Sequence, residues 1–428
     1  MSNVLILAAI VMLVLLFLKV PVYIAVLGGS MVYFVMNPSI NAIVFAQQAI
    51  VGTEKISLLA IPFFVCAGIF MNYTGVTRRI MDFCEVVTAH LPGGLAQVNV
   101  LLSTIMGGLS GSNIADAAME AKMLVPEMNK KGFSLEFSSV VTAASSMITP
   151  LIPPGIAMIL YGCIANVSIG KLFISGLGVG ALLCITMMIL VGIVSKKRGY
   201  GVLTTEKITK EKFWVSFKPA FLPLLLPIII IGGIRVGIFT ATEAGAVAII
   251  YALFLGIVYR EMKLGSILRG MKETVATTAS IMLIVAAASV FSWILTKERI
   301  PQTLTEWMLQ TINNKYVFLI VVNIFLLIVG MFIEGNASMI ILVPLLAPIA
   351  ASYGINEIQF AMIYIFNNAI GALSPPMGTL MFVTCSITKC KTAAFIKEAI
   401  PFYILLIVNL LLITWFEPFT TFLVNLFY

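Results

Sequence analysis

Two segments place glycine and oxygen-bearing side chains in the middle of long apolar stretches. Residues 107–113 read Gly-Gly-Leu-Ser-Gly-Ser-Asn, and residues 330–336 read Gly-Met-Phe-Ile-Glu-Gly-Asn. Glycine tolerates the backbone of a tight turn, and a turn between two helices exposes the last carbonyls of one and the first amides of the next. Carbonyl and hydroxyl oxygens suit Na⁺, and helix N-termini suit a carboxylate. Each segment therefore predicts a hairpin tip that binds ions.

A pair of adjacent prolines follows each predicted tip, at Pro153-Pro154 and Pro375-Pro376. Proline lacks an amide hydrogen, so two in succession leave carbonyls without partners upstream, here around Thr149 and Gly371. Such carbonyls persist in hydrocarbon only where another group satisfies them. We therefore expect each break to face a hairpin tip and to complete its site.

These patterns predict two sodium sites and one substrate site. The expected sodium ligands are Ser110, Ser112, Asn113 and Thr149 in the first half and Glu334, Gly335, Asn336, Gly371 and Thr379 in the second. The expected substrate-binding residues are Ser112, Asn113, Asp116, Ser146, Pro154, Asn336 and Pro376. Asp116 is open to several interpretations: a group that binds an ion or a proton, or one that stabilises the tip through the helix dipole.

No cofactor and no metal other than Na⁺ is expected. The chain has one histidine and six cysteines without a CxxC pair, which argues against a metalloenzyme and against disulfides. Its net charge of +8 is distributed over loops between apolar segments, so it does not indicate nucleic-acid binding.

The composition predicts an all-α integral membrane protein. Hydrophobic residues make up 61% of the chain and charged residues 10%, whereas soluble domains carry about 25% charged residues. Apolar runs long enough to cross a bilayer recur throughout. Full spans are predicted at 2–18, 20–36, 57–73, 134–165, 172–195, 219–236, 239–259, 275–296, 356–387 and 399–424, and re-entrant hairpins at 93–128 and 317–351.

The basic residues predict the orientation. With both termini outside, 20 of the 26 Lys and Arg residues fall on the inner side and 6, Lys55 among them, on the outer side. If either hairpin were one full span, every later loop would lie on the opposite side of the membrane, and the excess of basic residues on the inner side would be lost. The amphipathic segment 264–274 is expected to lie along the inner interface.

The two halves of the chain resemble each other. The proline pairs recur at an offset of 222 residues, as do the polar pairs Ser145-Ser146 and Asn367-Asn368 that precede them. Five spans and one hairpin in each half predict inverted repeats. The first repeat is 1–198, with scaffold at 1–92 and 166–198 and transport elements at 93–165. A basic cytoplasmic linker, 199–218, follows. The second is 219–428, with scaffold at 219–316 and 388–428 and transport elements at 317–387.

The chain resembles the large membrane subunit of TRAP transporters, the tripartite ATP-independent periplasmic family. The likeness runs along the whole chain and is most specific at Gly107–Lys122; it also includes Ile61–Phe64, Ile148–Gly155 and Gly237–Ala244. Such subunits often carry Asp where this chain has Glu334. The resemblance implies an elevator-type, sodium-coupled importer of small carboxylates in a bacterial inner membrane. It also implies two partners: a small four-helix membrane subunit, expected as a separate chain, and a periplasmic substrate-binding protein.

Three alternatives remain at the level of sequence. A stand-alone divalent-anion/Na⁺ symporter would share the paired hairpins, whereas a membrane-embedded enzyme would need clustered acids or metal ligands, and a channel would not concentrate its cargo. The cargo itself is not encoded in these motifs; sialic acid is the first expectation and C4-dicarboxylates the second.

Overall fold

The computed structural model describes residues 3–18, 20–205 and 208–428, and within these ranges the chain is helical, with no β-strand. This confirms the predicted all-α class. The fold divides into two halves, because the hairpin and the broken helix of the first half recur in the second at an offset of about 222 residues.

The first half begins with five helices and continues with a hairpin, a broken helix and a long helix. The five helices are α1 (Asn3–Phe17), α2 (Val22–Met36), α3 (Ile43–Thr53), α4 (Ala60–Asn72) and α5 (Val76–Thr88). The hairpin is α6 (Leu95–Ser110) and α7 (Asn113–Lys130); the broken helix is α8 (Leu135–Ser145) and α9 (Ile156–Ala165); α10 (Ile169–Arg198) follows.

The second half repeats this order, except that four helices precede its hairpin, because α13 takes the place of α3 and α4. The four helices are α11 (Lys210–Val236), α12 (Ala241–Val258), α13 (Leu264–Lys297) and α14 (Ile300–Thr311). The hairpin is α15 (Lys315–Phe332) and α16 (Gly335–Ser352), the broken helix is α17 (Glu357–Leu373) and α18 (Thr379–Thr388), and α19 (Thr392–Trp415) and α20 (Pro418–Phe427) end the chain.

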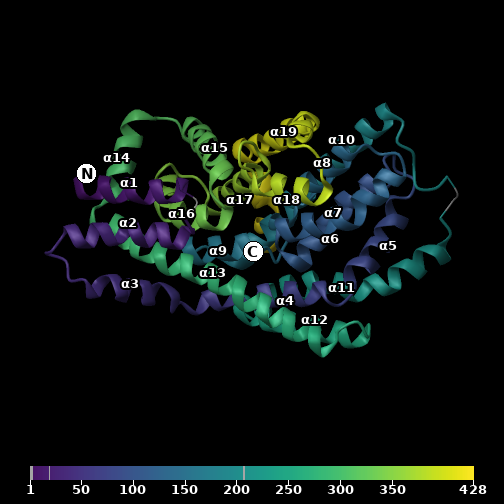
Figure 1. Cartoon of the computed structure of the whole chain (residues 1–428), viewed down its shortest axis with the longest axis horizontal. Coiled ribbons are helices and arrows are strands. Elements are labelled where there is room, and N and C mark those ends of the chain that lie inside the picture. Colours follow the sequence, from purple (N-terminus) through teal and green to yellow (C-terminus); the bar gives the residue numbers. More distant parts are fainter. Residues whose placement is uncertain (1–2, 19, 206–207) are drawn as a thin grey trace.

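Both predicted hairpin stretches are interrupted where the sequence indicated. The first breaks at Gly111, which has the left-handed φ of +63° that favours glycine, and the second breaks between Phe332 and Gly335. In Figure 1, α6 and α7 extend toward the end of the molecule where α5 and α10 lie, whereas α15 and α16 extend toward the end where α1 and α14 lie.

The predicted span boundaries need three corrections. The span expected at 57–73 is the second part of a bent pair, Ile43–Thr53 and Ile56–Asn72, with a 57° bend between them. Gln47 and Gln48 lower the hydropathy of α3, which hid it from the sequence analysis. Residues 264–274 are not a separate interfacial helix, because they continue directly into α13. The span expected at 399–424 ends at Trp415, and a new helix starts at Pro418, which cannot continue a helix from the preceding turn.

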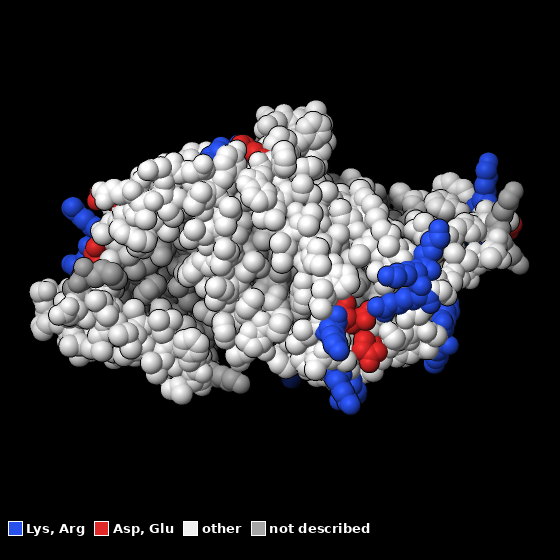
Figure 2. Space-filling view, turned by 90° about the horizontal axis from the view of Figure 1, so that it is seen from above, with Lys and Arg blue, Asp and Glu red and all other residues white. Residues whose placement is uncertain are grey.

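By length and composition, seven of the described helices could cross a membrane. The number of possible spans rises to nine if each bent pair counts as one span. This set differs from the ten predicted spans in two ways. The helices α1 and α2, and the α18 part of the predicted span 356–387, are too short to be counted, whereas α15 and α16, the two arms of the predicted second hairpin, are each long and apolar enough to be counted. Lys and Arg side chains gather toward the end of the molecule where α5, α10 and α11 lie, and a broad face beside them carries almost no charge (Figure 2).

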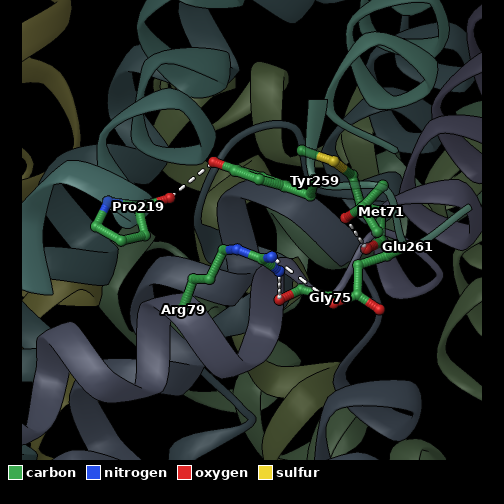
Figure 3. Close-up of polar contacts among 7 residues, drawn as sticks. Met71, Gly75, Arg79, Pro219, Tyr259 and Glu261 are labelled. Atoms are coloured by element: carbon green, nitrogen blue, oxygen red, sulfur yellow. Dashed lines mark hydrogen bonds and ion pairs between the residues drawn. The ribbon is translucent and has the colours of Figure 1, made fainter. Parts of the chain in front are cut away.

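A polar cluster around Arg79 ties the short helix α5 to α11 and to the residues that follow α12 (Figure 3). The guanidinium donates to the Gly75 carbonyl at 2.8 Å, lies 4.0 Å from the Tyr259 ring centroid and pairs with Glu261 at 3.7 Å. Tyr259 in turn donates to the Pro219 carbonyl at 2.7 Å. Because α5 leads directly into α6, this cluster fixes the point where the first hairpin leaves the frame.

Candidate functional site

Both hairpin tips and both proline breaks open onto one central cavity of about 170 Å³. The first residues of four helices line it: Asn113 of α7, Ile156 of α9, Gly335 of α16 and Thr379 of α18. A helix N-terminus carries partial positive charge and free amide hydrogens. Four N-termini that meet at one cavity make its walls attractive to an anion.

Two of these helix starts have a side-chain cap and two do not. Ser112 accepts from the Ala115 amide at 3.4 Å at the start of α7, and Glu334 accepts from the Ala337 amide at 3.1 Å at the start of α16. The N-cap positions of α9 and α18 are glycines, which have no side chain to accept a hydrogen bond. The first amides of α9 and α18 are therefore available to a ligand in the cavity.

A second group of oxygens lies behind the first tip and centres on Asp116. One carboxylate oxygen accepts from the Ser110 hydroxyl at 2.7 Å, and the other accepts from the Thr149 hydroxyl at 2.6 Å. Asp116 is 1% exposed, and all three side chains are buried. None of the three lines the central cavity. Ser110 beside the tip, the Asp116 carboxylate and Thr149 of the first break thus form an oxygen-rich group. Within the described residues, no Lys or Arg forms an ion pair with Asp116.

The polar group extends along the same hairpin, one turn beyond Asp116. Glu120 is fully buried, and both of its carboxylate oxygens lie within 2.9 Å of the Ser103 hydroxyl. Ser103 also contacts the Ser145 hydroxyl, which donates to Asn99. These hydrogen bonds join α6, α7 and α8 into one unit, because a buried polar group that lost its partner would be costly.

In the second half, amide side chains take the place of this network. Asn368 donates to the Gly335 carbonyl at 3.1 Å and accepts from Ser338 at 3.3 Å. Asn367 donates to Asn323 at 2.6 Å. The second tip is thereby held on its own broken helix, and Asn368 lines the cavity beside it.

Glycines allow each tip to approach its break closely. A Cβ built on Gly111 would lie 2.8 Å from the Pro154 carbonyl oxygen, and one built on Gly371 would lie 2.5 Å from the Cα of Gly330. Both contacts are with backbone atoms, which cannot turn aside as a side chain can. The spacing between hairpin and broken helix therefore depends on the missing side chains.

The structure separates the predicted site residues into two sets. Those that line the central cavity are Ser112, Asn113, Glu334, Gly335, Asn336 and Thr379. Those that do not are Ser110, Asp116, Ser146, Thr149, Pro154, Gly371 and Pro376. Within the second set, Ser110, Asp116 and Thr149 are joined by hydrogen bonds, as described above. The Ser146 hydroxyl donates instead to the Ala143 carbonyl of its own helix, and Pro376 lies on an exposed turn.

The sequence analysis missed two contributors. Asn368 was recognised as half of a repeated polar pair, but it was not assigned to the site that it lines. Ser103 gave no local signal, because a single serine in an apolar helix is common and its partner Glu120 is 17 residues away. The repeat offset could have identified Asn368, whereas Ser103 needed the structure.

Comparisons with known proteins show that this chain is similar to a family of membrane transporters. Residues 9–419 match the family model of the tripartite ATP-independent periplasmic transporter, DctM component. The sialic acid TRAP transporter large permease protein SiaM of Vibrio cholerae is 38% identical over 96% of each chain. The C4-dicarboxylate TRAP transporter large permease protein DctM of Pseudomonas aeruginosa is 36% identical over 91% of each chain.

Among solved structures, the YdaH transporter of Alcanivorax borkumensis superimposes with a TM-score of 0.51 at 12% identity, over 88% of this chain and 87% of that one. At that identity the likeness shows a shared fold and nothing more. The relatives are transporter permeases rather than enzymes, and the match to them runs almost from end to end. The chain therefore belongs to the DctM family of TRAP transporter large permeases.

Proposed function

We propose that this permease imports a small carboxylate together with Na⁺. The observation that carries the proposal is the convergence of four helix N-termini on one cavity, two of them without a side-chain cap. Free amides at α9 and α18 suit carboxylate oxygens. The amide side chains of Asn113, Asn336 and Asn368 line the same cavity and add hydrogen-bond donors.

The first sodium ion would bind at Asp116, Ser110 and Thr149. A hard cation prefers oxygen ligands, and these three side chains bring a carboxylate and two hydroxyls within hydrogen-bonding distance of one another. The charge of Na⁺ would also offset that of a carboxylate that is otherwise buried without a cation. This assigns Asp116 to the ion rather than to the substrate.

The second ion would bind at the second tip, where Glu334, Gly335, Asn336 and Thr379 line the cavity and Gly371 packs behind them. A sodium ion there would lie next to the bound carboxylate and would attract it. Bound Na⁺ would then favour binding of the carboxylate, and the bound carboxylate would favour binding of Na⁺. This mutual dependence would couple the transport of the carboxylate to that of Na⁺.

Transport would follow an elevator mechanism. The hairpins and broken helices, 93–165 and 317–387, share buried hydrogen bonds within each half and would move as one body. The remaining helices would form the fixed frame. The repeats would be inverted, with both termini in the periplasm, and the basic end of the molecule in Figure 2 would face the cytoplasm.

Two partners complete the scheme, as the family implies. A small four-helix membrane subunit would bind the frame and widen it, and a periplasmic binding protein would deliver the cargo. One relative is named for sialic acid and another for C4-dicarboxylates. For this chain we propose sialic acid first and C4-dicarboxylates second.

The test is uptake by proteoliposomes that contain both membrane subunits, with the binding protein outside. N-acetylneuraminate, succinate and other small acids would be compared with and without an inward Na⁺ gradient. Uptake of one acid that requires both Na⁺ and the binding protein supports the proposal. Uptake that persists without the binding protein would favour a stand-alone symporter, and uptake that never exceeds equilibrium would favour a channel.

A further inference from the structure

The bent pair formed by α3 and α4 contains a lysine at its break. The two helical segments end and begin at Thr53 and Ile56, so Glu54 and Lys55 lie in the 57° bend. The corresponding part of the second half is α13, which is one unbroken helix of 34 residues. The repeat therefore does not require this break, and the break is a feature of the first half alone.

Lys55 lies beside α13 part-way along its length rather than beside its end. Just before the bend, a Cβ built on Gly52 would fall within 2.6 Å of the Ser289 side chain of α13, so the two helices touch at this level. Ser289 is eight residues from Lys297, the last residue of α13, which corresponds to about 12 Å of helix. Lys55 is an exposed residue, so the helices around it do not enclose its charge.

Lys55 lines a cavity of about 140 Å³ between the frame and the transport elements. The frame contributes Ser289 and Ser292 of α13 as further polar groups, and the transport elements contribute Cys163 of α9 and Ile340 of α16. Lys55 forms no ion pair with any residue in the described ranges, and its neighbour Glu54 does not line this cavity. Its charge is therefore available to a ligand.

The helices α9 and α16 contribute lining residues both to this cavity and to the central one. On α9, Ile156 lines the central cavity, and Cys163, about 10 Å farther along the helix, lines the Lys55 cavity. On α16, Met339 lines the central cavity and Ile340 lines the other. Figure 1 shows α9 next to α16, in agreement with the packing of these two helices, and α16 also packs on α13.

Charge distinguishes the two cavities. The central cavity has one charged side chain, the carboxylate of Glu334, and no cation. The Lys55 cavity has one charged side chain, and it is a cation. An anion on its way to the central cavity would therefore meet an attractive charge first and the helix N-termini afterwards.

We propose that Lys55, with the hydroxyls of Ser289 and Ser292, forms a carboxylate-binding site on the access path to the central cavity. The identity of the carboxylate as cargo rests on the proposed function; the presence of an anion site does not. Because Lys55 belongs to the frame, α9 and α16 would leave it when the transport elements move. The site therefore attracts cargo only while the central cavity faces it.

The first test measures the anion site without transport. Ser292→Cys is introduced together with Cys163→Ala, because Cys163 lines the same cavity. The rates at which the new thiol reacts with an anionic and with a cationic methanethiosulfonate are then compared. With Lys55 present, the anionic-to-cationic rate ratio should exceed that of the Lys55→Gln variant about 25-fold, because one charge at close range in water changes the two rates about five-fold each in opposite directions.

The same assay tests recognition of a carboxylate. Succinate and N-acetylneuraminate should slow the anionic reagent when Lys55 is present and should have no effect on the Lys55→Gln variant. A matched control is Lys171→Gln, because Lys171 is also a cation, it lies near the Tyr428 ring and it lines none of these cavities. A rate ratio that is unchanged by Lys55→Gln, or that Lys171→Gln lowers equally, overturns the proposal.

Uptake provides the second readout. Lys55→Gln should raise the KM for the loaded binding protein several-fold with little change in kcat or in Na⁺ dependence, and Lys55→Arg should restore it. If Lys55→Gln raises KM but leaves the labelling ratio and the protection unchanged, Lys55 contacts the binding protein and the carboxylate site is rejected. If no acid is taken up by the parent protein, the proposed function fails while the labelling result still decides the anion site.

Discussion

The hydroxyl of Thr149 donates a hydrogen bond to the carboxylate of Asp116 at 2.6 Å, and this contact joins the first proline break to the first hairpin. The second carboxylate oxygen accepts from Ser110, next to the hairpin tip. Asp116 thus holds together the two segments that the sequence marked separately. A cation bound at this point, as we propose, would therefore also hold the tip against its break.

Replacing Asp116 with Asn should weaken sodium binding far more than substrate binding. The substitution keeps the shape but removes the only charge in the group, and hydrogen bonds or ion contacts to a charged group contribute about 1.5–3 kcal/mol, equivalent to at least a tenfold change in affinity. The Na⁺ concentration for half-maximal uptake should rise about tenfold or more. The measurement is initial uptake at saturating substrate over a range of Na⁺ concentrations.

Ser110→Ala and Thr149→Val should shift the Na⁺ dependence in the same direction by less, because each removes one neutral ligand. Ser112→Ala and Asn113→Ala provide the contrast, since both residues line the cavity. We expect them to raise the KM for substrate, with a smaller change in Na⁺ dependence. Unchanged Na⁺ dependence in Asp116→Asn would place the first sodium site elsewhere.

The hairpins and breaks could be predicted because their signals are local. Each proline pair removes two amide donors from a helix, and Gly111 adopts the left-handed φ of the turn after α6, so the chain near these residues had few alternatives. The pairing of Ser110 with Asp116 also follows from the turn between them, because the two residues are only six apart.

What could not be predicted depends on long-range packing. Lys55 looks like a loop residue until α13 is placed along α3 and α4. The helix α14 is short and has a polar and an apolar face, so neither length nor hydropathy marked it as an element. Asp116 could be read as a substrate, proton or dipole group, and only its contact with Thr149, 33 residues away, favours the ion.

Gly371→Ala should destabilise the protein, whereas Gly232→Ala should not. The new methyl group at 371 would lie 2.5 Å from the Cα of Gly330, and backbone must shift to accommodate it. Overpacking of this kind costs about 1–3 kcal/mol. A Cβ at Gly232 of α11 meets no atom within 4 Å, and alanine is the better helix former there. Thermal unfolding of the purified protein in detergent measures both; equal midpoints for the two variants would contradict the close packing of α15 on α17.

Arg79→Ala should destabilise the protein more than Glu261→Gln. Arg79→Ala removes the contact with the Tyr259 ring and the hydrogen bond to Gly75 as well as the ion pair. Glu261→Gln removes only the ion pair, and the Glu261 side chain is 53% exposed. Cation–π and surface ion-pair contributions are each about 0.5–1 kcal/mol. Thermal unfolding at low and at high salt separates them, because salt weakens the ion pair most. If Glu261→Gln proved the more damaging, the ion pair rather than the ring contact would anchor α5.

Cross-linking should distinguish motion of the whole transport body from motion of a gate. Ala288 of α13 and Ile340 of α16 line one cavity from opposite sides of the boundary between frame and transport elements. A disulfide between cysteines at these positions should abolish uptake, and reduction should restore it. The matched control lies within the transport body, where Asn99 of α6 and Thr142 of α8 are joined by a 2.6 Å hydrogen bond. Cysteines at this second pair should cross-link with much of the uptake retained, because α6 and α8 travel together. Both pairs require a background in which the native cysteines are replaced. If the link between α13 and α16 formed completely and uptake continued, the two bodies would not slide past each other, and a local opening of the hairpin tips would have to admit the substrate instead.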